Sequence, residues 1–385
     1  MNSDRYCLLV SDSPLDTVSH EALKSVLTKE SVELVEVSGS VAALEAVDEL
    51  APDIVFTTPL EEDESWLATI SDKVKPNPVV AFASDSNNGR VIKALRQGAS
   101  DFFVLPIDEP EYLVRSVLRQ LNKAKVIADS QYFRDELEQS LALLQEDQQA
   151  GRHVQQKMLP PNEVVINDYR FEYRIKPSLF LSGDFIDFFK ISESLSMFYL
   201  ADISGHGASS AFVTVLLKNM TNRLLRNYNR GSSFHILSPT DVLSRINTEL
   251  LDTGLGKHLT IFVGLLDRIE NTLQYGVGGH FPMPILQQSG KAEFLAGSGM
   301  PVGLFDDAQF DGRIVELEEE FCLTLFSDGI LEILDQPDLK AKENVLLETA
   351  ARGYDDLQDL AKALGVDQIE EAPDDIAALC VSRVV

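Results

Sequence analysis

Apolar runs of four or five residues alternate with helix-periodic segments over residues 1–122. Such runs are typical of buried strands, and apolar residues spaced three or four positions apart are typical of helices. We predict strands at residues 6–10, 34–37, 54–57, 79–83 and 102–105, with helices near 15–27, 41–50, 64–74, 89–97 and 109–121. This regular alternation predicts a doubly wound α/β domain with a parallel sheet.

Residues 123–159 show neither a strand pattern nor a proline, which predicts a helical connector. Leu137, Leu141, Leu144 and Met158 fit a seam whose spacing alternates between four and three residues. This spacing favours a short parallel coiled coil that forms a homodimer. The alternative is a helix that packs against its own domain. Gly151 is expected to be a weak point, because glycine costs a helix about 1 kcal/mol relative to alanine.

Beyond residue 159 the pattern changes to many short strands with intervening helices, so residues 160–385 are expected to form a further domain. We predict strands near 169–175, 198–201, 259–266, 272–277, 281–286 and 323–326 and after residue 375, with helices at 211–226 and 239–251. The mixture of strand runs and helices indicates an α+β architecture.

Four aspartates stand at strand ends in this region, namely Asp184, Asp202, Asp328 and Asp374. Carboxylates do not gather without a cation, because their mutual repulsion raises their pKa values. Oxygen ligands without His or Cys indicate Mg²⁺ or Mn²⁺, and two such ions about 4 Å apart can activate water for attack on phosphorus. A simpler alternative for Asp202 is that it caps the helix that follows.

Composition narrows the classes of function. The 385 residues carry a formal net charge of -28, which disfavours nucleic acid and anionic membranes as partners. No apolar run is long enough to span a bilayer and the first residues lack a signal-peptide pattern, so the cytoplasm is the expected location. The three cysteines lie in apolar, strand-like surroundings without metal-binding spacing, and we expect them to be buried thiols.

Residues 1–122 resemble the receiver domain of bacterial response regulators. The resemblance rests on the stretch RQGASDF at 96–102, on Pro106 and on PDIVF at 52–56. It implies the flavodoxin-like strand order 2-1-3-4-5.

Several chemical positions of a receiver are changed in this sequence. The phosphoacceptor position holds Thr58, the acidic pair is reduced to Ser11-Asp12, and the lysine expected before Pro106 is Leu105. Without a carboxylate nucleophile at this position, an aspartyl phosphate cannot form there. We therefore interpret this domain as a pseudo-receiver whose surface binds a partner. The competing hypothesis is phosphorylation of Thr58 itself.

Residues 150–385 resemble the metal-dependent (PPM-type) protein serine/threonine phosphatases, in the bacterial branch related to the sporulation stage II E phosphatase. The aspartate motifs occur in that family's order, together with GRHVQQKMLP at 151–160, VGGHFP at 277–282 and GMPVGL at 299–304. The resemblance implies a sandwich of two antiparallel sheets flanked by helices. It also implies that Asp202 bridges two metal ions, that the Ile203 carbonyl and Asp184 serve the first ion, and that Asp328 and Asp374 hold the second.

Departures from that family's pattern leave these aspartates intact. The double glycine before Asp184 is Ser182-Gly183, and Ala377 replaces a threonine after the last acidic pair. We expect His206 to pack or cap a helix rather than act in catalysis, and we expect His280 to make a structural hydrogen bond. Asp187 lies close to Asp184 in sequence but between phenylalanines, and is left out of the site.

The sequence therefore predicts a phosphoserine/phosphothreonine phosphatase fused to a pseudo-receiver. The resemblance implies a small phosphorylated substrate of the anti-sigma factor antagonist class. The alternative function is an adaptor that binds a sigma factor or another regulator through the receiver face, with the phosphatase domain as a scaffold.

Overall fold

The computed structural model describes residues 5–12, 15–58, 65–83, 88–205, 207–354 and 356–384. The chain divides into two compact units, Met1–Leu141 (unit 1) and Ala142–Val385 (unit 2). No helix within these described ranges combines the length and the apolarity needed to cross a bilayer. Each unit has its own core and is considered separately below.

Unit 1 contains a five-stranded sheet in which every pairing is parallel. Its strands are β1 (Arg5–Val10), β2 (Val32–Val37), β3 (Ile54–Thr57), β4 (Val79–Ala83) and β5 (Asp101–Val104). Their order across the sheet is β2-β1-β3-β4-β5, which is the flavodoxin-like order expected above. The doubly wound α/β prediction for this part of the chain is confirmed.

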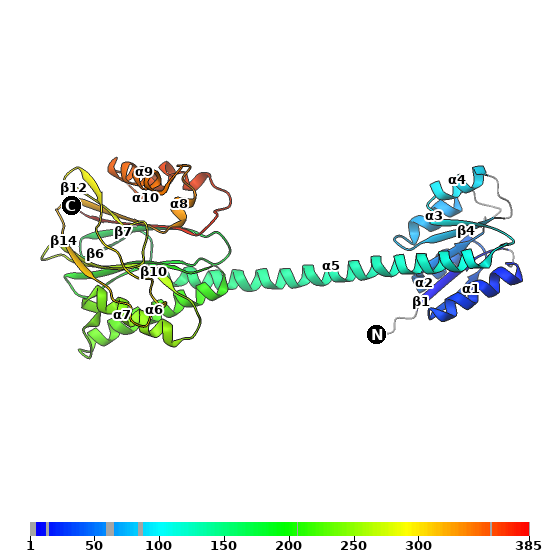
Figure 1. Ribbon diagram of the computed structural model, residues 1–385, viewed down its shortest axis with the longest axis horizontal. Helices are drawn as coiled ribbons and strands as arrows, with labels where there is room; N and C mark the ends of the chain where they lie inside the picture. Colours follow the sequence, from blue (N-terminus) through cyan, green and yellow to red (C-terminus); the bar gives the residue numbers. More distant parts are fainter. Residues whose placement is uncertain are drawn as a thin grey trace. The chain divides into compact units, whose positions relative to one another are not determined.

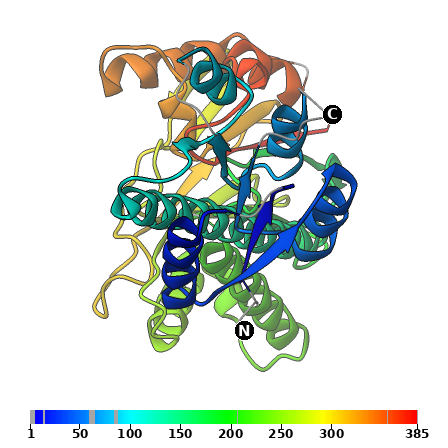
Figure 2. The same ribbon diagram turned by 90° about the vertical axis from the view of Figure 1, so that its right-hand side faces the viewer.

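Helices cover both faces of this sheet, as Figure 2 shows. They are α1 (Thr17–Lys29), α2 (Ser40–Leu50), α3 (Trp66–Lys73), α4 (Asn88–Arg96) and α5 (Pro110–Met158). One apolar cluster joins α1 and the first turns of α5 to the sheet, through residues such as Leu23 and Val117. A second cluster joins α2 and α3 to the opposite face, through Val47 and Ile70. Burial on both faces explains why the strands are almost uninterrupted apolar runs.

Helix α5 is one uninterrupted helix of 49 residues, and it includes most of the predicted connector. The seam residues Leu137, Leu141 and Leu144 are 59%, 49% and 54% exposed. Gly151 lies inside this uninterrupted helix, and a Cβ atom there would lie 3.3 Å from Leu181 Cδ2. Glycine lets the helix approach the loop that carries Leu181.

Unit 2 contains two antiparallel sheets. The five-stranded sheet has the order β14-β11-β10-β9-β8, built from β8 (Asp184–Lys190), β9 (Leu195–Ile203), β10 (Leu259–Asp267), β11 (Thr272–Gly278) and β14 (Gly312–Glu316). The six-stranded sheet has the order β13-β12-β15-β16-β7-β6, built from β6 (Val164–Ile166), β7 (Tyr169–Lys176), β12 (Ile285–Gln288), β13 (Lys291–Phe294), β15 (Phe321–Phe326) and β16 (Ile376–Arg383).

Three apolar cores define the layers of unit 2. The two sheets pack face to face through aromatic residues such as Phe171, Phe198 and Phe262. The other face of the five-stranded sheet is covered by α6 (Ala208–Asn229) and α7 (Pro239–Asp252). The other face of the six-stranded sheet is covered by α8 (Gly329–Glu332), α9 (Leu339–Ala351) and α10 (Leu357–Ala363). Figure 1 shows the resulting helix–sheet–sheet–helix sandwich, as the phosphatase resemblance implied.

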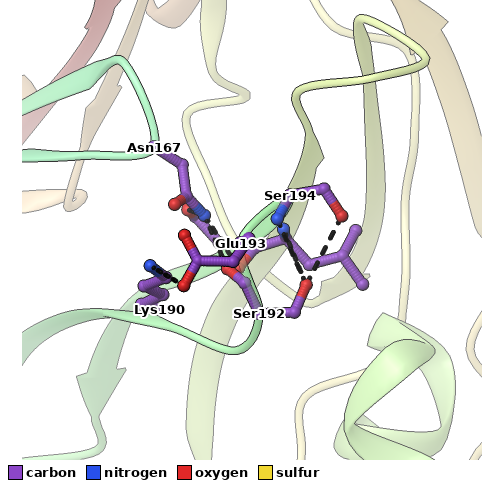
Figure 3. A network of polar contacts seen from close by, with 7 residues as sticks. Asn167, Lys190, Ser192, Glu193 and Ser194 are labelled. Atoms are coloured by element: carbon purple, nitrogen blue, oxygen red, sulfur yellow. Dashed lines mark hydrogen bonds and ion pairs between the residues drawn. The ribbon is translucent and has the colours of Figure 1, made fainter.

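The hairpin of β8 and β9 has its register fixed at its turn (Figure 3). Asn167 donates hydrogen bonds from Nδ2 to the Ser192 carbonyl oxygen at 2.9 Å and to Ser196 Oγ at 3.0 Å. Ser192 Oγ accepts from the backbone nitrogen of Leu195 at 3.1 Å, and Lys190 pairs with Glu193 at 2.7 Å. Because a slip of one residue would turn every side chain to the opposite face, this turn determines which residues meet at the far end of the hairpin.

One strand prediction in unit 2 is wrong. Residues 281–286 were expected to form a strand, but β12 runs from Ile285 to Gln288. Pro282 and Pro284 interrupt the apolar run, and proline cannot donate the backbone hydrogen bond that a strand ladder needs. The strand therefore begins after the second proline.

Candidate active site

The first pair of aspartates comes from the open end of the β8–β9 hairpin. Asp184 is the first residue of β8 and lies directly opposite Asp202 on β9. Directly opposed residues of an antiparallel pair project on the same face, so their carboxyl groups are neighbours. Asp202 does not cap the following helix, because the cap residue of α6 is Gly207 and no side chain caps that end. The capping alternative for Asp202 is therefore wrong.

The second group of aspartates comes from the six-stranded sheet. Asp328 follows β15 at the start of α8, and Asp374 and Asp375 immediately precede β16. Ser327 joins the two sheets at this point, because its hydroxyl donates to Asp184 Oδ2 at 2.7 Å. The same hydroxyl accepts from the backbone nitrogen of Ala377 at 2.8 Å. The predicted site residues of both sheets thus meet at one end of the sandwich.

Asp375 organises the loop before Asp184. Its Oδ1 accepts hydrogen bonds from the backbone nitrogen and hydroxyl of Ser178 at 2.7 and 2.9 Å, and its Oδ2 accepts from the Gly183 nitrogen at 2.6 Å. The sequence reading placed Asp375 only as the neighbour of Asp374. The only signal in the sequence was the adjacent acidic pair. The separate role of Asp375 depends on contacts with residues nearly two hundred positions away.

Glycine at position 183 is required by close backbone packing. A Cβ atom there would lie 2.9 Å from the Ile203 carbonyl oxygen and 3.2 Å from the Gly205 carbonyl oxygen. The Ile203 carbonyl, predicted as a ligand, therefore stands beside the turn that leads into Asp184. The small residue next to Asp184 keeps two strand ends within contact distance.

Burial and like charge raise the pKa values of these carboxyl groups. The pKa of Asp184 lies well above its usual value because the group is buried and faces the charge of Asp202. Burial, followed by the charges of Asp328, Asp374 and Asp375, raises the pKa of Asp202 to about 7. Burial and the charge of Asp374 also raise the pKa of Asp328.

These residues fit a hard divalent cation. Asp184 Oδ1 is buried without a hydrogen-bond partner among the described residues, although buried carboxylate oxygens are ordinarily paired. The donor set consists of carboxylates and one backbone carbonyl, which are the ligands that Mg²⁺ and Mn²⁺ prefer. Among the described residues, the side chains as they stand form no group of three or more His, Cys, Asp or Glu that could hold a metal ion. The fit therefore rests on the chemistry of the donor set and on the unpartnered Asp184 oxygen.

Gln155 is a residue of the site that the sequence reading missed. It lies near the end of α5, and its Nε2 donates to the Ser182 carbonyl oxygen at 2.7 Å and to Thr214 Oγ1 at 3.3 Å. Its Oε1 accepts from the Ser182 backbone nitrogen at 3.2 Å. The sequence analysis included position 155 only within the stretch GRHVQQKMLP at 151–160 and gave it no role. Its buried amide ties the helix to the turn two residues before Asp184.

Lys257 holds the segment that follows Asp202. Its ammonium group donates to the Ser204 carbonyl oxygen at 2.8 Å and to Ser210 Oγ at 3.3 Å. It brings positive charge to the edge of an acidic cluster. No motif in the sequence identified Lys257, because its partners lie about fifty residues away.

His280 and Asp187 were not among the predicted metal ligands. His206 lies outside the described residues. Both ring nitrogens of His280 are buried without hydrogen-bond partners in the described part of the chain, so the structural hydrogen bond expected for it is not found. Burial lowers the pKa of His280 to about 3, which keeps the ring neutral. Asp187 is buried and paired with Lys218 at 2.7 Å, which explains its place among the phenylalanines.

Two cavities of unit 2 differ in their relation to the aspartates. A cavity of about 280 Å³ reaches Asp184 and is also lined by Arg152, Gln156 and Arg174. A larger one, of about 580 Å³, is lined by residues such as Arg170 and Asp356 and by none of the four predicted aspartates. We therefore place the site at the cluster of carboxyl groups and not at the larger cavity.

In unit 1, Thr58 and Ser11, the residues that the resemblance places at a receiver's chemical positions, are hydrogen-bonded to each other. Thr58 Oγ1 donates to Ser11 Oγ at 3.1 Å. Asp12 Oδ1 accepts from Ser38 Oγ at 2.9 Å and from the Gly39 nitrogen at 3.0 Å, so this carboxylate fixes a neighbouring loop. Residues 59–64 and 84–87 lie outside the described residues.

A two-sheet sandwich with aspartates from both sheets at one end defines the class of unit 2 as a PPM-family serine/threonine phosphatase domain. The chain belongs to the stage II sporulation protein E (SpoIIE) family, whose model matches residues 192–384.

Curated relatives cover different parts of the chain. Phosphoserine phosphatase RsbP of Bacillus subtilis is 26% identical over 47% of this chain, which spans 44% of that protein. Regulator of RpoS of Escherichia coli is 22% identical over 70% of this chain and 79% of that protein. Among solved structures, the SiaA-PP2C domain of Pseudomonas aeruginosa has a TM-score of 0.51 at 17% identity, covering 63% of this chain and 98% of that domain. This last similarity shows the fold alone.

The raised pKa values predict a pH-dependent effect of Asp202→Asn in the presence of a metal chelator. A carboxyl group whose folded-state pKa is raised from 3.8 to about 7 costs stability progressively as the pH rises through that interval, because the unfolded state releases the proton that the folded state still binds. We expect Asp202→Asn to gain stability over the native chain between pH 4 and pH 8, by on the order of 2 kcal/mol after allowing for solvent screening. Denaturant unfolding at each pH measures this difference, and a difference that stays constant with pH would contradict the mutual repulsion.

Substitution of Gln155 is predicted to disturb the turn before Asp184. In Gln155→Ala, the buried backbone nitrogen and carbonyl of Ser182 lose their partner, at a cost of about 1–3 kcal/mol. Gln156→Ala is the matched control, because Gln156 lines the same cavity but is exposed. Thermal or denaturant unfolding is the measurement. Equal effects of the two substitutions would show that the Gln155 contacts carry no special weight.

Proposed function

We propose that unit 2 hydrolyses phosphoserine or phosphothreonine in a protein substrate, with two Mg²⁺ or Mn²⁺ ions at the aspartate cluster. The observation that carries this proposal is the meeting of Asp184, Asp202 and Asp328 from two different sheets, with a buried Asp184 oxygen that has no protein partner. Bound ions would supply an activated water and polarise the phosphoryl oxygen.

The roles of the ligands follow from their places in the site. Asp202 is central, because its carboxyl group faces both Asp184 and the acidic groups of the six-stranded sheet. We assign Asp202 as the bridging ligand, Asp184 and the Ile203 carbonyl to the first ion, and Asp328 and Asp374 to the second. Asp184 and Asp202 are thus the residues assigned to catalysis.

Other residues of the chain position these ligands. Ser327 orients Asp184 through its Oδ2, which leaves Oδ1 available to a ligand. Asp375 holds the loop at Gly183, and Gln155 holds Ser182. Preorganised ligands lose little freedom when a cation binds, so these contacts favour metal binding.

The proposed substrate is a small phosphoprotein of the anti-sigma factor antagonist class. The relative named phosphoserine phosphatase supports phosphoserine as the substrate group, and its alignment lies within about half of this chain. The family resemblance supplies the class of protein that carries the phosphate. The net charge of -28 favours a partner with positive charge around the modified residue.

For unit 1 we propose a pseudo-receiver at residues 1–122, joined through a connector at 123–159 to the phosphatase domain at 160–385. The hydroxyl pair of Thr58 and Ser11 at the receiver's phosphorylation position supports binding rather than phosphorylation as its activity. The alignment with Regulator of RpoS covers 70% of the chain, more than unit 2 contains, so it extends into unit 1.

A second candidate function is an adaptor that binds a sigma factor or another regulator through the receiver face. The same alignment with Regulator of RpoS favours it, since that relative is named for regulation and not for catalysis. The two functions make opposite predictions for metal-dependent turnover.

The phosphatase proposal predicts Mn²⁺-dependent hydrolysis of p-nitrophenyl phosphate by the full chain. Asp202→Asn is expected to reduce turnover at least about a hundredfold, because the bridging carboxylate is lost. Asp307→Asn, on an exposed loop, is the control and should retain native activity. Calorimetric titration with Mn²⁺ is run in parallel. A chain that neither turns over the phosphate nor binds Mn²⁺ would favour the adaptor.

The connector proposal predicts a homodimer held by the exposed seam of α5. Leu141→Lys places a charge in that seam and is expected to weaken dimerisation at least about tenfold. Leu143→Lys is the matched control, because Leu143 is 65% exposed and lies off the seam. Sedimentation equilibrium measures both variants. A native chain that stays monomeric at micromolar concentration would contradict the proposal.

A further inference from the structure

Two of the three cysteines lie side by side on neighbouring strands of the six-stranded sheet. The Sγ atoms of Cys322 on β15 and Cys380 on β16 are 3.1 Å apart. Both side chains are partly exposed, whereas Cys7 is buried in unit 1. The sequence analysis expected three buried thiols, and that expectation is correct only for Cys7.

The sheet register explains why the two sulfur atoms meet. Cys380 pairs directly with Thr324, and Cys322 lies two residues before Thr324 on the same strand. Residues two apart on a strand project on the same face, so the two thiols are diagonal neighbours on one face of the sheet. Both line a pocket of about 90 Å³ together with Tyr354 and Leu357. A water-sized molecule needs roughly 10–15 Å³, so a small oxidant has room to enter.

The two thiols differ in acidity. The hydrogen bond between the two sulfur atoms lowers the pKa of Cys322. The same hydrogen bond, together with burial, raises the pKa of Cys380 well above its usual value. A thiolate is the reactive form of cysteine, so Cys322 is the nucleophile that reacts first. Cys380 is the thiol that reacts in the second step. Glu172, opposite Cys380 on β7, faces both sulfur atoms and opposes ionisation of each.

We propose that Cys322 and Cys380 form a redox-active pair that hydrogen peroxide converts into an intramolecular disulfide. The Cys322 thiolate attacks one peroxide oxygen, the O–O bond breaks, and the departing hydroxide takes up a proton to leave as water. The Cys380 sulfur then attacks the resulting sulfenic sulfur and displaces hydroxide, which leaves as water with the Cys380 proton. Two thiols lose two electrons and two protons in total, and one peroxide becomes two waters.

The disulfide would join the two strands that lead to the second group of aspartates. Cys322 lies on β15, which ends just before Asp328, and Cys380 lies on β16, which begins just after Asp375. Diagonal positions are farther apart than directly opposed ones, so the cross-link requires adjustment of the strands. Strained disulfides are reduced readily, which makes this modification reversible by a dithiol.

The test is oxidation of the full chain with hydrogen peroxide, followed by alkylation of the remaining thiols and mass spectrometry. We expect two of the three thiols to resist alkylation, a peptide that links Cys322 to Cys380, and recovery of both thiols after dithiothreitol. The thiol of Cys7 should stay reduced and should therefore be alkylated once the chain is denatured. Disulfides between chains, or sulfinic acid at Cys322 without a cross-link, would overturn the proposal.

Variants separate this pair from general thiol oxidation. Cys380→Ser should lose the cross-link and leave Cys322 as a sulfenic acid that a dimedone probe traps, whereas Cys7→Ala should form the cross-link like the native chain. Because the cross-link closes a long loop, oxidation should also raise the melting temperature of the native chain by about 2–4 °C and leave Cys380→Ser unchanged. A cross-linked peptide in Cys380→Ser, or its absence from Cys7→Ala, would contradict the assignment.

Discussion

The repulsion among the aspartates at the shared end of the two sheets of unit 2 is the constraint on which this site depends. Burial is the largest cause of the raised pKa values of Asp184 and Asp202, and the charge of Asp202 adds to the first while the charges of Asp328, Asp374 and Asp375 add to the second. The protein offsets this cost with hydrogen bonds from residues around the cluster, among them Ser327 to Asp184 and the Gly183 nitrogen to Asp375. Those bonds hold the groups in place but do not neutralise them, and so a cation remains the natural complement.

The same constraint explains why the sheets have the arrangement that they do. Asp184 and Asp202 come from one hairpin, while Asp328 and Asp374 come from the ends of two strands in the other sheet. Only a face-to-face packing that aligns these ends brings the groups together. The aromatic core between the sheets fixes that alignment, and the Asn167 network at the β8–β9 turn fixes the register of the hairpin. Packing far from the site thus determines its geometry.

The pattern of apolar residues along the chain was enough to predict those strands whose bounds depend on neighbouring residues alone. The strands at 54–57 and 79–83 have the predicted bounds, because buried parallel strands are nearly continuous apolar runs. The positions of the predicted aspartates could be recognised in the sequence, because strand ends and small residues mark them. The strand expected at 281–286 is displaced because two prolines remove hydrogen-bond donors, which an apolar count does not register.

What the sequence did not predict depends on partners far away in the chain. Gln155 and Lys257 reach residues 27 and 53 positions away, and the partner of Asp375 at Ser178 is 197 positions away. Cys322 and Cys380, 58 positions apart, likewise meet only through the register of two strands. His280 shows the opposite case. Its place in a turn predicted a hydrogen bond, but its buried ring lies beside Phe262 and has no hydrogen-bond partner among the described residues.

The contact of Gln155 with Ser182 also sets the scale for any regulation through α5. A partner that shifts or rotates the end of this helix has to break the hydrogen bonds that Gln155 makes with the buried backbone of Ser182. Leaving those groups unpaired costs about 1–3 kcal/mol, which corresponds to roughly a 5- to 150-fold change in the population of the intact turn. Because Asp184 follows Ser182 by two residues, such a displacement would act directly beside a carboxyl group of the site. Under the proposed function, the contact of Gln155 with Ser182 is therefore a direct structural link between α5 and the aspartate cluster.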